Sequence, residues 1–287
     1  MTVTTAAQFI DEVWDPELNR AVEFDTVIAG LFADLTGRMR GHGDVFHRVD
    51  RHNLTANTKS ASADATPESI TEGEQTFTVN THQIVAQQIE DIAQVLSRYD
   101  IRQEYTLAAA YSLSRAFDVA CAALLDDNTL QTVGVLQAEL TDDNLIRAWQ
   151  YGADSAAKGQ AKGIVSPATW GGLLKIEKFT NQLFNGDSGG RALHDAQIGK
   201  VYNATFYQSQ LTVGTAPNSS GHMWWGDHFF KIIKKAPKND AWFSPLAKSW
   251  VLATDQIYGT FENQEADEAA AVTSRARLHS VRLQSLK

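Results

Sequence analysis

The middle of the chain carries apolar residues at helical spacing. Within residues 102–125, one apolar stripe follows the period of about 3.6 residues: Leu107, Ala110, Tyr111, Ser114, Phe117, Cys121, Leu124 and Leu125. Neither glycine nor proline interrupts this stretch, so the pattern predicts one continuous helix. At about 1.5 Å per residue such a helix is roughly 35 Å long, which indicates a structural rod.

A second helix is expected after Leu140, because Thr141 is a good N-cap residue and Asp142 and Asp143 place negative charge in the first turn. Its buried face is expected to consist of the apolar and small residues at helical spacing: Leu145, Ile146, Trp149, Ala153 and Ala156. Gly159 and Gly163 are expected to end this helix.

Shorter elements are expected next. Ile164 and Val165 predict a short buried strand, and Ser166-Pro167 predicts a helix start with proline at the first helical position. Residues 198–213 predict strands. Helices and strands in this order indicate a mixed subdomain.

Residues 41–76 are polar and form an insert far longer than the ~12–15 residues above which structureless loops are uncommon. A strand-like alternation marks both ends, with apolar Val45, Phe46 and Val49 on the way out and Phe77 and Val79 on the return. The insert is either disordered or a long β-hairpin. A lone hairpin is marginal in water, so these five residues are predicted to contact a neighbouring subunit.

The N-terminal region has apolar residues at helical spacing until Pro16 interrupts them, including Phe9, Val13 and Trp14. This predicts an arm with short helical pieces and enough apolar surface to need a partner. Phe9 and Trp14 are therefore predicted intersubunit contacts.

Aromatic side chains concentrate between Trp224 and Phe243, where burial is favoured over base stacking because the segment is not markedly basic. Strands and an acidic turn are expected over residues 247–272. The basic end of the chain, from Arg275 to Lys287, is interpreted as a solvated terminus in preference to a DNA contact.

Composition narrows the class of protein. The chain has 287 residues, of which 43% are hydrophobic, enough for one large domain or two intimate subdomains. A formal net charge of -9 disfavours specific nucleic-acid binding. With one cysteine, Cys121, neither an intrachain disulfide nor a cysteine-rich zinc site is expected. The sequence shows no signal-peptide pattern and no run of about 18 apolar residues, so no membrane span is expected.

One short motif suggests catalysis. Residues 186–190 read Gly-Asp-Ser-Gly-Gly, the string that surrounds the nucleophile of chymotrypsin-like proteases, which makes Ser188 a candidate. The upstream histidines lack that family's setting, and the predicted helices occupy chain that should form strands. The protease hypothesis is therefore remote.

The histidines do not indicate a metal site. His42, His47 and His52 are spaced by five residues, which suits neither one helix face nor one strand face. His222 and His228 flank Asp227 and could coordinate an ion, but ordinary partly buried histidines are the favoured interpretation. No cofactor or metal is expected.

The order of these parts carries a family resemblance that spans residues 9–277. Leu140-Thr141 starts a helix, a strand and the Ser-Pro helix start follow at 164–170, IGKVYNATFYQSQL follows at 198–211, and Tyr258-Gly259 suits a closing strand. The sequence thereby resembles the major capsid proteins of tailed bacteriophages with the Hong Kong 97-like fold.

The resemblance implies an α+β capsid fold in four parts. These are an N-terminal arm at 1–42, an extended β-hairpin loop at 43–82, a peripheral domain with a long spine helix at 83–135 and 255–287, and an axial domain at 136–254. It implies a structural subunit with no enzymatic activity.

The resemblance further implies partners and location. The subunit is expected to form hexamers and pentamers with copies of itself, and to build an icosahedral head that encloses double-stranded DNA without sequence-specific binding. Scaffolding and portal proteins, with cement proteins as an option, are further expected partners, and no membrane is involved. The resemblance also implies that the subunit assembles in the bacterial host cytoplasm and then resides in the virion. The alternatives are an encapsulin-like nanocompartment shell, a serine hydrolase using Ser188, and a phage protein outside the shell.

Overall fold

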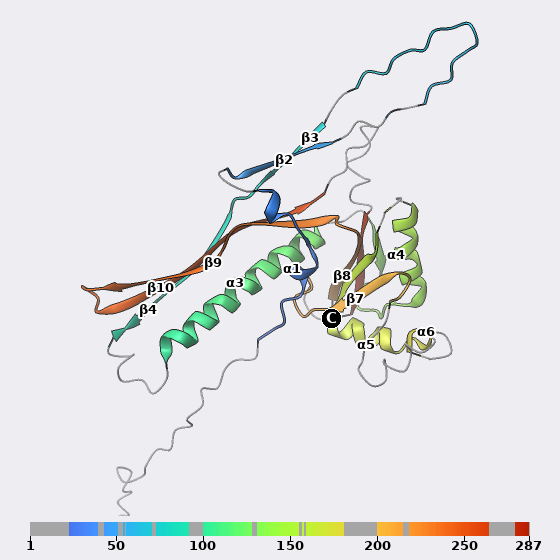
Figure 1. The fold of residues 1–287 in the computed structure, drawn as a ribbon. Coiled ribbons are helices and arrows are strands. Elements are labelled where there is room, and N and C mark those ends of the chain that lie inside the picture. The colour runs from blue at the N-terminus through green and yellow to red at the C-terminus, as the bar shows by residue number, and fades with distance from the viewer. Residues whose placement is uncertain are drawn as a thin grey trace, which may run out of the picture.

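A computed structural model describes most of the chain (Figure 1). The described residues are 23–39, 43–50, 54, 56–70, 73–91, 100–127, 131–154, 157, 159–180, 200–214, 218–263 and 279–286. Within them, two larger sheets lie side by side, and a two-stranded hairpin extends from one of them.

The longer sheet has four described strands in the order β1-β9-β10-β4. Its centre is an antiparallel hairpin of β9 (Phe229–Ser244) and β10 (Ser249–Glu262), the longest strands described. Strand β4 (Thr81–Glu90) runs antiparallel to β10, and the short β1 (Ala33–Asp34) runs parallel to β9.

The predicted long helix is confirmed as α3 (Ile101–Asp126), which lies along one face of the longer sheet (Figure 1). Asp100 caps its first turn by accepting a hydrogen bond from the Gln103 N–H at 3.3 Å. Phe117 packs against Tyr258 of β10 with ring centroids 4.4 Å apart. By length and composition α3 could cross a membrane, but helices packed in protein cores pass the same test.

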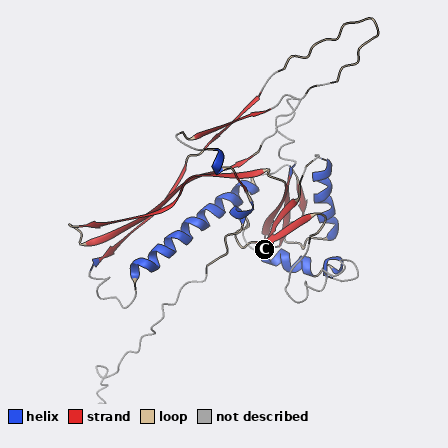
Figure 2. Cartoon of the chain, in the orientation of Figure 1, coloured by secondary structure: helices blue, strands red, loops and turns tan. Residues whose placement is uncertain are grey.

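The second sheet has five described strands in the order β5-β11-β8-β6-β7. Figure 2 shows its strands in red with helices in blue beside them. Their bounds are β5 (Thr132–Gly134), β6 (Ala161–Val165), β7 (Ala204–Gln208), β8 (Asn218–Trp225) and β11 (Ser280–Leu286). Three helices accompany this sheet, namely α4 (Asp142–Asp154), α5 (Pro167–Leu174) and α6 (Glu177–Thr180). A core cluster including Leu145, Val165 and Met223 lies between helices and strands.

The remaining described elements belong to the N-terminal half. Helix α1 (Ile28–Leu31) and the 3-10 helix η2 (Thr36–Arg38) flank β1, and β2 (Val45–Asp50) pairs antiparallel with β3 (Gly73–Thr78). The alternation seen in the sequence at both ends of the polar insert thus predicts the hairpin correctly. Between its strands, residues 56–70 run outward, away from both sheets (Figure 1).

Both predicted helix starts in the second sheet's region are confirmed. The Asn144 N–H lies 3.4 Å from Thr141 Oγ1, and the Thr169 N–H donates to Ser166 Oγ at 3.2 Å. Ser166 precedes Pro167, the first residue of α5, as the sequence predicts. These side chains satisfy backbone donors that have no partner within the helix.

The buried face of α4 differs from the prediction. Leu145 is buried as expected, but its companions on that face are Ala148 and Gly152, whereas Trp149 is 43% exposed. Ile146 and Ala153 are exposed as well. The reason is the close approach of Trp225, whose ring occupies the space beside Gly152 and leaves no room there for a larger residue. Ala156 lies outside the described residues.

The end of the chain corrects a second prediction. Residues 280–286 are not a solvated terminus but form β11, an interior strand of the five-stranded sheet between β5 and β8. Val281 and Leu283 are fully buried, and Arg282 lies between them on the opposite face. Arg275, Arg277 and Lys287 lie outside the described residues.

Strand pairing also crosses the domain boundaries expected from the sequence. Residues 229–254, placed with the axial part, lie in the hairpin of β9 and β10, and β10 pairs with β4 beside α3. Residues 280–286, placed with the peripheral part, pair with β8. The physical reason is that β9 and β10 form one continuous hairpin, which a boundary at residue 254 would divide.

Candidate functional site

The β2–β3 hairpin offers exposed apolar side chains. Val49 is 68% exposed, and Val45 is also exposed. Phe46 is half-buried and stacks on Phe77, with ring centroids 6.2 Å apart. Further out, Leu54 and Ile70 are exposed as well. Apolar surface of this kind on a projecting element is typical of protein–protein contact.

Phe77 and Val79 correct part of the predicted contact set. Both are buried within their own chain, in a cluster with Phe230 and Ile232 of β9. They anchor the root of the hairpin to the longer sheet and are not available to a neighbour. Val45, Phe46 and Val49 remain predicted contacts, while Phe9 and Trp14 lie outside the described residues.

A second exposed apolar surface lies at the far end of the β9–β10 hairpin. Leu246, in the turn, is 100% exposed, and Trp242 is exposed nearby. Phe243 packs against Trp250 with ring centroids 5.4 Å apart, and the Arg102 guanidinium lies 4.9 Å from the Trp250 ring centroid. The sequence offered a signal for this surface, namely a leucine directly after Pro245 between two strands.

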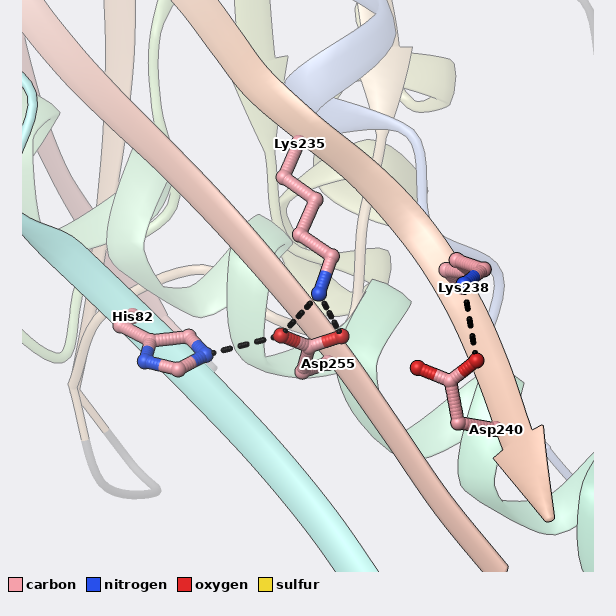
Figure 3. Close-up of polar contacts among 5 residues, drawn as sticks. All are labelled: His82, Lys235, Lys238, Asp240 and Asp255. Atoms are coloured by element: carbon pink, nitrogen blue, oxygen red, sulfur yellow. Dashed lines mark hydrogen bonds and ion pairs between the residues drawn. The ribbon is translucent and has the colours of Figure 1, made fainter.

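A charged cluster crosses the three long strands (Figure 3). Asp255 of β10 accepts hydrogen bonds from Lys235 Nζ of β9 at 2.6 and 2.5 Å, and lies 3.0 Å from His82 Nε2 of β4. Lys235, followed by His82, holds the pKa of Asp255 below its ordinary value. Beside it, Lys238 Nζ pairs with Asp240 at 2.9 Å. The contacts of Asp255 hold three neighbouring strands in register, whereas Lys238 and Asp240 both lie on β9.

A partly buried polar cluster joins α3 to the second sheet. Asp126, the last residue of α3, lies 3.4 Å from Arg282 Nε of β11 and 3.9 Å from His222 Nε2 of β8. The Arg282 guanidinium also donates to the backbone carbonyl of Asp126. Complete burial, with a contribution from Arg282, lowers the pKa of His222 to about 3. The histidine is therefore neutral at physiological pH.

The geometry separates the histidines considered as metal ligands. His222 faces Asp126 and Arg282, whereas His228 lies 3.0 Å from Glu262. Within the described part of the chain, no group of three His, Cys, Asp or Glu side chains is arranged to hold a metal ion. His47 lies in an exposed pair with Glu74 across β2 and β3, and His42 and His52 lie outside the described residues.

A cavity of about 290 Å³ lies where five segments of the chain meet. Arg38, Arg48, His228 and His279 are among its lining residues. Arg48 donates to Asn263 Oδ1 at 2.8 Å, which ties β2 to the end of β10. These contacts join the root of the hairpin to the body of the subunit.

The candidate nucleophile Ser188 and its glycines lie outside the described residues. The surrounding fold is that of two open sheets with long helix α3, and a double β-barrel of the protease type is not its architecture. Cys121 is buried, and burial raises the pKa of its thiol well above the ordinary range, so it is a core residue as predicted.

Comparison with solved structures identifies the fold. The chain is similar to a structure from Mycobacterium phage Che8, with a TM-score of 0.81, 18% sequence identity, and coverage of 96% of this chain and 97% of that chain. It is similar to the capsid structure of the cyanophage P-SCSP1u, with a TM-score of 0.74, 14% identity, and coverage of 99% and 95%. For the head structure of Helicobacter pylori bacteriophage KHP40 the TM-score is 0.70, the identity 11%, and the coverage 99% and 98%.

These likenesses extend over nearly the whole of each chain, so the chain has the Hong Kong 97-like α+β fold that the sequence predicts. No protein-family model matches the sequence, and neither does any curated protein. The order of weak motifs along the chain predicts this fold, although each motif alone is loose.

Proposed function

We propose that this chain is a major capsid protein that assembles with copies of itself into the icosahedral head of a tailed bacteriophage. The observation that supports this most is the likeness to phage capsid and head structures over almost the full length of both chains. An enzyme with this capsid fold would be expected to carry a catalytic site in addition to the features of the fold. The described side chains instead form strand-tying pairs and apolar contact surfaces.

In this proposal the domain boundaries follow the pairing of the strands. The longer sheet with α3 is the peripheral domain, the five-stranded sheet with α4, α5 and α6 is the axial domain, and residues 43–82 form the extended loop. Residues 1–42 form the arm, of which 23–39 are described. Val45, Phe46 and Val49 contact a neighbouring subunit, and so do Trp242 and Leu246 at the end of the long hairpin.

Small contact surfaces of this kind are sufficient for the assembly of a closed shell. Each contact is small, but every subunit repeats it around the shell, and closure adds the contacts together. Hexamers and pentamers are the expected rings, with scaffolding and portal proteins as further partners. The net charge of -9 suits an inner wall that encloses double-stranded DNA without holding it. The particle assembles in the bacterial host cytoplasm and the subunit then resides in the virion.

The decisive experiment is electron microscopy of the protein produced alone and together with its candidate scaffolding protein. Closed particles with five-fold and six-fold clusters are expected. Particles that package double-stranded DNA during infection support the phage head over an encapsulin-like shell, which would contain protein cargo. A chain that remains monomeric under both conditions, or that reacts at Ser188 with a fluorophosphonate probe, would overturn the proposal.

A further inference from the structure

The first described segment of the chain crosses the junction of the two sheets. Ile28 and Phe32 are its buried side chains. They pack in one cluster with residues from four other elements: Cys121, Ala122 and Leu125 of α3, Ile164 of β6, Trp224 of β8 and Phe229 of β9. The segment therefore contacts both the longer sheet with its helix and the five-stranded sheet.

One end of this segment is held by a buried carboxylate. Asp118 of α3 is 0% exposed, and its Oδ1 accepts a hydrogen bond from the Ala29 N–H at 2.6 Å. The N–H groups of Ile28 and Val27 also donate to this carboxylate. Burial raises the pKa of Asp118, while these backbone donors and Lys231 act in the opposite direction. A carboxylate is costly to bury, so the contacts that it makes here have a specific structural role.

Two lysines hold the carbonyl groups of the same segment. Lys231 Nζ of β9 donates to the Ala29 carbonyl at 2.7 Å, and Lys162 Nζ of β6 donates to the Leu31 carbonyl at 2.8 Å. The lysines come from different sheets, and each satisfies a carbonyl with no strand partner. A negative charge thus faces the backbone N–H groups and two positive charges face the carbonyls, which matches the polarity of the peptide groups.

After these contacts the chain joins the longer sheet. Ala33 and Asp34 form β1, which pairs in parallel with Phe230 and Lys231. The two sheets are also connected by the short turn between β8 and β9, where Gly226 adopts a positive φ of 58°, and by Asp126 at the end of α3, which contacts Arg282 of β11. The segment adds a further connection at a different place along the junction, and this connection restricts the angle between the sheets.

We propose that residues 27–34 are a strap that fixes the angle between the two sheets, with Asp118 and Lys162 as its positioning residues. The strap deepens the proposed function, because the angle between the parts of a shell subunit determines the curvature of the shell. Its consequence for shells rests on that function, whereas the strap itself is a property of the single subunit. An experiment can therefore contradict the strap without contradicting the capsid function, or contradict the capsid function without contradicting the strap.

The test measures the angle directly. Spin labels on Q150C in α4 and K238C in β9, both exposed, report the distance between the sheets in the unassembled subunit, and buried Cys121 stays unlabelled. In the wild type the distance distribution is narrow. In D118A it broadens, and the amides of residues 27–31 exchange hydrogen about tenfold faster or more.

The matched control is L113A. Leu113 is buried in α3 on the face toward β10 and outside the strap cluster, so this variant loses stability without touching the strap. It is expected to leave the distance distribution narrow. D118N keeps one acceptor oxygen and should broaden the distribution less than D118A.

Equal distributions in D118A and L113A would overturn the proposal. If D118A does not fold, K162Q decides the matter, because Lys162 is only half-buried and its replacement removes one contact between β6 and the strap. K162Q is expected to broaden the distribution, and a distribution as narrow as that of the wild type would refute the strap. A subunit that passes this test but forms no shell would contradict the proposed function alone.

Discussion

Phe77 of β3 packs edge-on against Phe230 of β9, with ring centroids 5.1 Å apart and ring planes at 85°. This contact anchors the root of the projecting hairpin in the core of its own subunit, although the sequence had suggested a contact with a neighbour. Residues further along the hairpin, above all Val49, have no such cover. One end of the hairpin is therefore packed within its own subunit and the other is exposed. A mutation at the packed end should reduce the stability of the subunit, whereas a mutation at the exposed end should affect assembly.

V49D should prevent shell closure without harming the subunit. Val49 is 68% exposed, so a charged residue there costs little in the monomer, but it places an unpaired charge in the proposed interface. The thermal midpoint of unfolding is expected to stay within about 2 °C of the wild type, because surface substitutions change stability by roughly ±0.5 kcal/mol or less. V49T serves as the control, and normal particles from V49D would show that this side chain lies outside the interface.

F77A should destabilise the subunit itself. Phe77 is 9% exposed and contacts the rings of Phe46, Phe230 and Phe261, so truncation leaves a cavity and costs about 3 kcal/mol or more. The measurement is chemical denaturation of the unassembled protein, with T78A as the neighbouring exposed control. A loss below about 1 kcal/mol would mean that the hairpin root is not part of the core.

A pair of helical glycines tests the packing of the second sheet. A Cβ at Gly152 would lie 2.2 Å from Trp225 Cζ2, whereas a Cβ at Gly171 meets nothing within 4 Å. G152A should therefore lose about 2 kcal/mol or more through overpacking, while G171A should gain up to about 1 kcal/mol from helix propensity. Comparing the free energies of unfolding checks both, and a neutral G152A would show that α4 can move away from Trp225.

Helix boundaries followed from the sequence because their signals are local. The uninterrupted stretch after Asp100 gave α3, and the Thr141 and Ser166 caps gave the starts of α4 and α5 within a residue or two. Such signals depend on neighbouring residues along the chain, so one sequence suffices to read them. The hairpin alternation at Val45 and Phe77 is of the same kind.

The features that the sequence did not predict depend on contacts between residues that are distant along the chain. Which face of α4 is buried is decided by Trp225, more than seventy residues away, and the burial of Phe77 is decided by Phe230. The basic residues near the end of the chain suggested exposure, but Arg282 has its partner in Asp126 at the end of α3. Contacts of this range have no signature in the local pattern, and the Asp118 contact with Ala29 was missed for the same reason.

Acid is expected to destabilise the subunit through His222. Burial lowers the pKa of this histidine from 6.5 to about 3, so between these values the unfolded chain binds a proton that the folded chain does not. Stability is therefore unaffected by this group above about pH 6.5 and falls as the pH drops below it. At pH 5 the loss is about 2 kcal/mol, since 1.5 pH units below the unfolded pKa correspond to that free energy.

H222Q removes the titrating group and should remove this loss. The measurement is the free energy of unfolding of the wild type and of H222Q at pH 7.5 and at pH 5. Any packing cost of the substitution appears at both pH values and cancels, so the wild type should lose about 2 kcal/mol more than H222Q on acidification. If H222Q and the wild type lose the same stability, the His222 side chain reaches solvent or pairs with Asp126 in acid, and the junction between α3 and the five-stranded sheet is looser than its burial indicates.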